Sequence, residues 1–245
     1  MRNPASRHSG FPTSASPAHG RLWRPQFARR VREGFLRTVV SISCLTAVFF
    51  AAYFGVQRHP AYVPVVMPLT WLDMIVPFQP AALVAYVSLW IYVGVGPGLQ
   101  RTIADFAVYL LWLSALCLCG LAIFFFWPTQ APVRLALATH FPGFAVLHRV
   151  DLTSNACPSM HVAVAIFTAV RVEDVLRSLG APRWLRMANL AWFLVIAYST
   201  LATKQHVALD VVAGALLGVL IAVMSLRWRP GEARQASFAT VAVPP

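Results

Sequence analysis

The chain has 245 residues, of which 58% are hydrophobic and only 11% are charged, and its mean hydropathy is positive. Soluble domains carry roughly 25% charged residues, so this composition excludes an ordinary soluble domain and predicts an integral membrane protein. The formal net charge of +12 does not indicate a nucleic-acid partner, because the arginines gather in the N-terminal segment and in short stretches between apolar runs.

The N-terminal segment, residues 1–34, is rich in Arg, Pro, Ser and Gly and has almost no aliphatic runs. This composition predicts a disordered basic cytoplasmic tail. An organelle transit peptide is the alternative that an Arg- and Ser-rich, acid-poor tail leaves open, whereas a signal peptide has a shorter basic region.

Six apolar segments follow the tail, and each is close to the roughly 20 residues that a helix needs to cross the hydrocarbon core. They predict an all-α fold, a polytopic six-transmembrane-helix bundle. The fourth segment is the weakest, because Arg171, Glu173 and Asp174 enter its last turns. The segments cover residues 35–56, 80–98, 103–127, 159–176, 184–203 and 207–226.

The distribution of Lys and Arg predicts the orientation of the bundle. With the N-terminus inside, 16 of these residues lie on the inner side and 4 on the outer side, which is a clear positive-inside bias. Both termini are then cytoplasmic, and the starts of the fourth and sixth helices lie on the outer face with the 128–158 loop. We expect a multi-pass protein of the plasma (inner) membrane, with a first helix and outer loop at 35–79, a membrane core at 80–226 and a second disordered tail at 227–245.

His206 and Asp210 lie four residues apart at the start of the sixth segment, so they share one helix face. A carboxylate that accepts from one imidazole nitrogen leaves the other nitrogen available as a nucleophile or base. A metal-binding pair and a structural ion pair are the other readings of this spacing.

A second polar cluster, "PSMH" at 158–161, opens the fourth segment. Pro158 and Ser159 are typical residues for a helix start, and Ser159 could simply cap it. Capping does not account for His161, because an apolar residue would cost less free energy in the first turn of a membrane helix. A buried structural histidine is the alternative for His161 and equally for His206.

Two cations are expected on the same outer side. Arg134 lies in the 128–158 loop and Lys204 just precedes His206. The alternatives are an ordinary interface residue for Arg134 and a side chain that extends to the lipid headgroups for Lys204.

Together these residues indicate phosphoryl transfer. Two histidines, an orienting carboxylate, cations, a hydroxyl and the amides of two helix starts supply the nucleophile, the acid and the anion-binding groups that this chemistry needs. We expect no cofactor, since neither a zinc set nor an acidic magnesium set is apparent in the sequence. The four cysteines do not suggest a disulfide framework and are read as apolar filler.

The chain resembles the type-2 phosphatidic acid phosphatase superfamily, on two motifs. "PSMH" at 158–161 is similar to its P-S-x-H motif, and "HVALD" at 206–210 is similar to its H-x-x-x-D motif. The resemblance covers residues 80–226 and includes the six-helix layout. It implies that His206 forms a phosphohistidine, that Asp210 orients it, that His161 protonates the leaving alkoxide and that Ser159 holds a phosphate oxygen.

The sequence departs from this family at its arginines. The first motif, K-x6-R-P, is absent, and Arg134 is the candidate substitute. Ser199 of the third motif is present, but Thr200 stands where the family has Arg, and Lys204 is the candidate for that charge. These changes resemble the branch related to inositol phosphorylceramide synthases, which passes the phosphoryl group to an alcohol, so hydrolysis and transfer both stay open.

A stripe of His206, Asp210, Gly214 and Gly218 predicts where the sixth helix packs, because small residues allow close approach of another helix. We expect this stripe to face a matching stripe of His161 and Ala165.

The leading hypothesis is a lipid-phosphate phosphatase or phosphotransferase that acts at the outer face of the membrane. Its partners are then a lipid phosphate and the bilayer, with no nucleic acid. The alternatives are a non-catalytic phospholipid-binding or transport protein and a metal-dependent hydrolase. The particular lipid, the acceptor and the oligomeric state are not indicated by the sequence.

Overall fold

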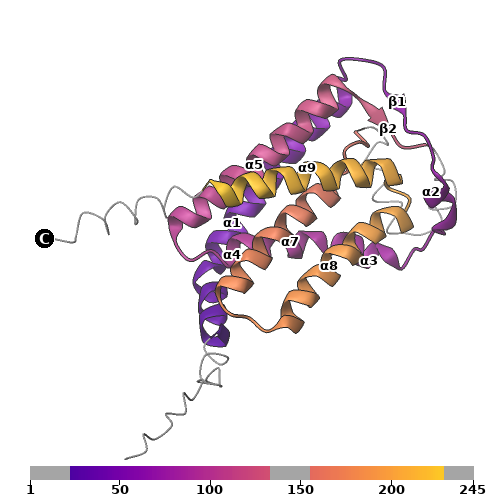
Figure 1. Cartoon of the computed structure of the whole chain (residues 1–245). Helices are drawn as coiled ribbons and strands as arrows, with labels where there is room; N and C mark the ends of the chain where they lie inside the picture. Colours follow the sequence, from indigo (N-terminus) through magenta and orange to yellow (C-terminus); the bar gives the residue numbers. More distant parts are fainter. Residues whose placement is uncertain (1–22, 133–154, 229–245) are drawn as a thin grey trace, which may run out of the picture.

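The computed structural model describes residues 23–132 and 155–228. Arg134, much of the 128–158 loop, residues 1–22 and residues 229–245 lie outside the described residues, so the predictions made for them are not tested. The described part is helical apart from one short parallel pair of strands (Figure 1). Its elements are α1 (Trp23–Arg58), β1 (Val65–Val66), α2 (Trp71–Ile75), α3 (Ala82–Val87), α4 (Leu89–Gly98), α5 (Ile103–Phe126), β2 (Thr129–Gln130), α7 (Met160–Ser178), α8 (Arg183–Ala202) and α9 (Ala208–Arg227).

Helices occupy all six positions where the apolar segments predict them. Four of them, α1, α5, α8 and α9, are long and apolar enough to cross a membrane. The second segment is a shorter apolar stretch, Ala82–Gly98, divided into α3 and α4. The fourth, α7, carries charged side chains in its second half, at Arg171, Glu173 and Asp174. A helical membrane protein is therefore supported, whereas the count of six spans is not confirmed.

The first helix begins earlier than the sequence predicts. We expected residues 1–34 to be disordered, but α1 starts at Trp23, so this prediction is wrong for residues 23–34. Arginine is a good helix former, and a basic segment can continue a helix when its charges find partners. Arg30 supplies such a contact, because its guanidinium donates to the carbonyl of Leu99 at the end of α4 (3.2 Å).

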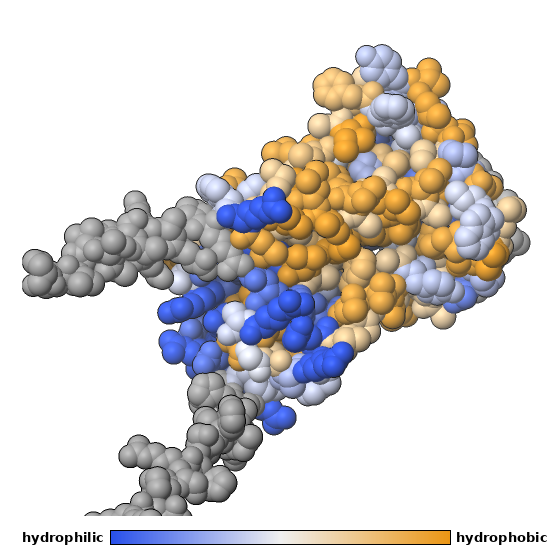
Figure 2. Space-filling model, in the orientation of Figure 1, coloured by the Kyte–Doolittle hydropathy of each residue, from blue (hydrophilic) through white to orange (hydrophobic). Residues whose placement is uncertain are grey.

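The helices surround α7, which packs against α4, α5, α8 and α9. The start of α1 and the end of α9 lie toward one end of the bundle, and β1, β2 and α2 lie toward the other (Figure 1). Hydrophilic side chains gather toward the first end, and apolar side chains cover the visible faces of α5 and α9 (Figure 2). The N-terminal ends of α7 and α9 meet at the end that holds the strands.

The contact between α7 and α9 depends on two glycines of α9. A methyl group at Gly214 would overlap the backbone carbonyl of Ser159, and one at Gly218 would overlap that of Ala163. The predicted glycine stripe therefore does face α7. Our prediction for the matching stripe is wrong, because the residues that face these glycines are Ser159 and Ala163 and not His161 and Ala165. Two residues turn a helix by about 200°, so His161 points away from the face that Ala163 presents to α9.

We predict that Gly214→Ala lowers the thermal unfolding temperature in detergent and reduces activity, because the methyl group forces two backbones apart. Overpacking of this kind costs about 1–3 kcal/mol. The matched control is Gly55→Ala on α1, where an added Cβ meets nothing within 4 Å. Equal unfolding temperatures for the two variants would contradict the close packing of α7 on α9.

Candidate active site

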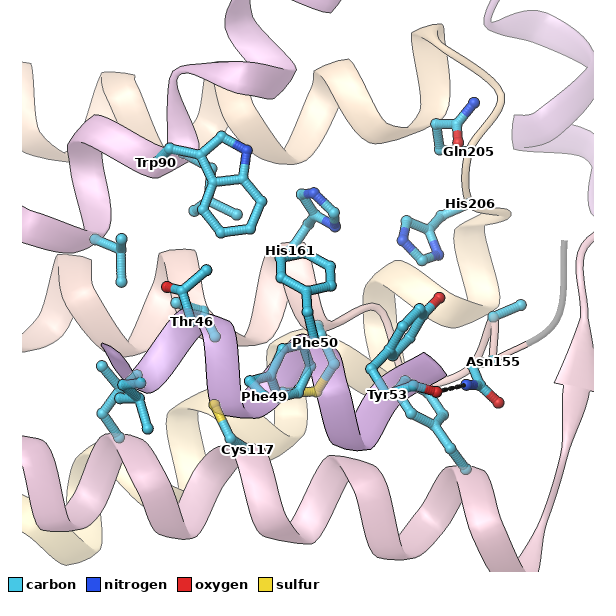
Figure 3. Close-up of a pocket in the computed structure, with 18 of the residues that line it drawn as sticks. Thr46, Phe49, Phe50, Tyr53, Trp90, Cys117, Asn155, His161, Gln205 and His206 are labelled. Carbon is cyan, nitrogen blue, oxygen red and sulfur yellow. Dashed lines mark hydrogen bonds between the residues drawn. The ribbon is translucent and has the colours of Figure 1, made fainter. Parts of the chain in front are cut away.

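His161 and His206 line the same cavity (Figure 3). His161 is in the first turn of α7, and His206 lies in the turn between α8 and α9, two residues before α9 begins. Their ring centroids are 6.0 Å apart and the ring planes are inclined by 55°. The convergence predicted from the two motifs is thus present in the structure.

Asp210 lies beneath His206 with no exposed surface. Its Oδ2 accepts a hydrogen bond from the backbone amide of Val207 (3.0 Å) and is 3.5 Å from Nδ1 of His206. That distance is longer than a hydrogen bond, although such contacts are often long before substrate binds. The backbone carbonyl of Asp210 accepts from the amide of Ser159 (2.9 Å), which ties the start of α7 directly to the first turn of α9.

Two aromatic residues that the sequence analysis missed hold the ring of His161. Tyr86 of α3 stacks on it, with centroids 4.2 Å apart and an interplanar angle of 26°. The hydroxyl of Tyr86 is 3.3 Å from Nδ1 of His161, and Trp90 of α4 meets the ring edge-on at 6.3 Å. Both residues lie in an apolar segment more than 70 positions upstream, where nothing in the local pattern distinguishes them from core residues.

The turn that carries His206 is fixed by its backbone. The carbonyl of Thr200 accepts from the amides of Gln205 and His206, both at 3.2 Å. Lys204 adopts a positive φ of 59°, an unusual conformation for a residue with a Cβ. The position where the family that the motifs resemble has an arginine is thus a buried threonine, whose backbone carbonyl holds the loop that carries His206.

Lys204 lines the cavity, but its ammonium also binds the protein's own backbone. It donates to the carbonyl of Asp73 (2.9 Å) and to that of Val76. The Asp73 carboxylate, which the sequence analysis missed, accepts from the amide of Ala208 (2.8 Å). We expected the amides at the start of α9 to bind phosphate, but one of them, that of Ala208, already donates to a side chain of α2.

Ser159 caps α7, as the simpler interpretation of the sequence predicts. It is fully buried, and its Oγ accepts from the amide of Val162 (3.5 Å). It is not among the cavity-lining residues of the described part of the chain. Arg134 lies outside the described residues, so its predicted approach to the histidines is not tested. Within residues 23–132 and 155–228, no three His, Cys, Asp or Glu side chains form a group that could hold a metal ion.

The fold and this site define a helical membrane protein with two histidines and a buried aspartate at one end of its bundle. Comparison with known families identifies its superfamily, because the model of the PAP2 superfamily matches residues 55–224. That range is more than half of the chain and contains both histidine motifs, so the protein belongs to the PAP2 superfamily, the type-2 phosphatidic acid phosphatase superfamily that its motifs resemble. No curated protein and no solved structure matches the chain. Membership suggests phosphatase or phosphotransferase activity on lipid phosphates.

Cys157 gives a chemical probe of the site, because it lies beside Asp210 and outside the spanning segments. Burial, and secondarily the negative charge of the Asp210 carboxylate, raise the pKa of the Cys157 thiol to about 11. Since the thiolate is the reactive form, the thiol is nearly inert at neutral pH, and its reactivity increases only as the pH approaches that value.

We predict that a variant with Cys157 as its sole cysteine is alkylated slowly by iodoacetamide at pH 8, and that Asp210→Asn accelerates the reaction several-fold by removing the adjacent charge. The measurement is the alkylation rate across pH 7 to 10 by intact mass. Labelling in denaturant is the control for reagent quality. An unchanged rate in Asp210→Asn would show that the thiol does not sense this carboxylate.

Proposed function

We propose that the protein cleaves or transfers the phosphate group of a membrane lipid through a phosphohistidine at His206. The observation that supports this best is the pair of imidazoles 6.0 Å apart in one cavity, with Asp210 Oδ2 3.5 Å from Nδ1 of His206. With Nδ1 directed at the carboxylate, Nε2 of His206 is the nitrogen left for attack on phosphorus.

The reaction proceeds in two displacements. Nε2 of His206 forms a bond to phosphorus as the bond from phosphorus to the lipid oxygen breaks, and His161 gives its proton to the departing alkoxide. The oxygen of water or of an alcohol then bonds to phosphorus as the bond from phosphorus to Nε2 of His206 breaks, and the proton of the attacking hydroxyl passes to His161. The released products are the lipid alcohol and either inorganic phosphate or a new phosphate ester.

Charge on the phosphoryl group is balanced by cations near the cavity. Lys204 contributes its positive charge there, although two backbone carbonyls use part of its hydrogen-bonding capacity. Arg134 is the predicted second cation. Ser159 is fully buried and does not line the cavity, so we do not assign it a phosphate oxygen. Because the family's arginines are missing, we keep the resemblance to the inositol phosphorylceramide synthase branch as a proposal, and with it the transfer of phosphate to an alcohol.

The site is proposed to face the outer side of the plasma membrane. The arginine count predicts this orientation, and both described chain ends lie at the end of the bundle opposite β1, β2 and α2 (Figure 1). The exposed indoles of Trp71 and Trp127 lie near the site end, as aromatic residues do at a membrane–water interface.

We predict that His206→Ala abolishes phosphate release from a panel of lipid phosphates by the purified protein, whereas Asp210→Asn retains more activity. The asparagine keeps the geometry but favours the wrong imidazole tautomer, a change that costs about 10⁴-fold in a serine protease triad. Thin-layer analysis with inositol or diacylglycerol as acceptor distinguishes transfer from hydrolysis. Equal release by wild type and His206→Ala would instead favour a phospholipid-binding or transport protein.

We predict that His161→Ala slows the cleavage of lipid phosphates far more than that of an aryl phosphate. A general acid contributes about 10²–10⁴-fold, and a good leaving group does not need it. The ratio of kcat/KM for the two substrates, measured in both proteins, is the test. Trp90→Phe, which changes the cavity wall beside His161 without removing a hydrogen-bonding partner of its imidazole, is the control for disturbance of the pocket. A uniform loss on both substrates in His161→Ala would reject the acid role.

A further inference from the structure

The cavity continues from the histidines into the membrane part of the bundle, between α1, α4, α5 and α7. Its polar residues gather at one end, where His161, His206 and Gln205 lie with Asn155 (Figure 3). The rest is almost entirely apolar or aromatic. Such a gradient, polar at the mouth and apolar in the depth, fits a ligand with a charged head and a hydrocarbon tail.

The depth of this cavity can be measured along its two longest walls. On α1 its lining runs from Ile42 to Tyr53, and on α5 it runs from Leu113 to Phe124. Each wall covers eleven helical steps, or about 16 Å at 1.5 Å per residue. The hydrocarbon core of a bilayer is about 30 Å thick, so the cavity is about as deep as one leaflet.

The volume of the cavity limits what it can hold. It is about 120 Å³, slightly smaller than an apolar cavity of about 150 Å³ that holds benzene. Two chains side by side therefore do not fit, and a single extended chain requires the lining side chains to move apart.

The wall formed by α1 lies outside the part of the chain that the PAP2 family model matches. The PAP2 match begins at residue 55, so the α1 residues that line the cavity lie outside it. Side-chain contacts close this wall against its neighbours. Phe50 packs on Trp90 of α4 with centroids 5.5 Å apart, and Tyr53 meets Phe124 of α5 at 5.9 Å.

We propose that this cavity binds one hydrocarbon tail of the lipid phosphate, with Thr46 on α1 and Cys117 on α5 lining its deeper half. The tail runs from the histidines toward the inner half of the bundle, beside the aromatic face of α1. The proposal rests on the proposed function for the phosphate group, but the tail site itself can be tested without turnover.

The direct test is photo-crosslinking of the full-length protein in nanodiscs with hexadecyl phosphate that carries a diazirine near the end of its tail. Peptide mapping should find adducts on the cavity-facing residues of α1 and α5, in both wild type and His206→Ala, and excess unlabelled hexadecyl phosphate should remove them. Adducts confined to lipid-facing positions such as Val48 and Cys119 would overturn the proposal.

A functional test uses two residues of one helix. Cys117 is buried and lines the cavity, whereas Cys119, two positions on, is exposed on the outer surface of α5. Cys117→Phe should fill the deep part of the cavity and raise KM for hexadecyl phosphate by about tenfold or more, with little change for butyl phosphate. Cys119→Phe should leave both values as in wild type.

Thr46→Phe on α1, with the exposed neighbour Ala47→Phe as its control, repeats this test from the opposite wall in case Cys117→Phe does not fold. A tail-length profile that is unchanged in both cavity variants, or a loss of equal size for long and short tails, would overturn the assignment. If wild type releases no phosphate from any substrate, the proposed function fails, and the crosslinking result still decides whether the cavity holds a tail.

Discussion

The close packing of α7 on α9 is the constraint on which the site depends. Two backbones touch where Gly214 faces Ser159 and Gly218 faces Ala163, and no side chain separates them. The hydrogen bond from the amide of Ser159 to the carbonyl of Asp210 fixes the two helix starts at the same level. Because α7 turns by about 200° between His161 and Ala163, the face that packs on α9 and the face that carries the imidazole are nearly opposite. One helix therefore anchors the site and supplies a histidine to the cavity.

A second set of contacts holds the loop that carries His206. α2 lies outside the main bundle, yet the carboxylate of Asp73 caps the amide of Ala208, and its backbone carbonyl accepts from Lys204. Asp73 is almost fully buried although it lies in a short helix of a loop. These contacts give Lys204 a structural task in addition to the electrostatic one that the sequence suggests. They also explain why a lysine suits this position, since a compact ammonium on a flexible stem can reach two carbonyls and still face the cavity.

The parts of the structure that the sequence predicts are those set by local pattern. Hydropathy marks the positions of all six helical segments, and the four-residue spacing of His206, Asp210, Gly214 and Gly218 predicts the packed face of α9. The partners of these residues are not predictable in this way. Tyr86 and Asp73 come from segments 75 or more positions away, and their roles arise only when α3 and α2 pack against the site. The start of α1 was misjudged because its arginines resemble a tail in composition, while the bond from Arg30 to the carbonyl of Leu99 forms only when α1 packs beside the end of α4.

The two functions of the cavity are built from different kinds of contact. α7 carries His161, and α9 follows the turn that carries His206. These two helices meet backbone to backbone, so a substitution at their interface must move the groups proposed to act on phosphate. The wall formed by α1, in contrast, meets α4 and α5 through aromatic side chains, and side-chain contacts tolerate volume-conserving exchange at a cost below about 1.5 kcal/mol. Changes in α1 can therefore reshape the proposed tail site while His161 and His206 keep their spacing. This wall lies outside the PAP2 match, whereas both histidines lie inside it, so the proposed chemistry and the proposed choice of lipid fall on different parts of the chain.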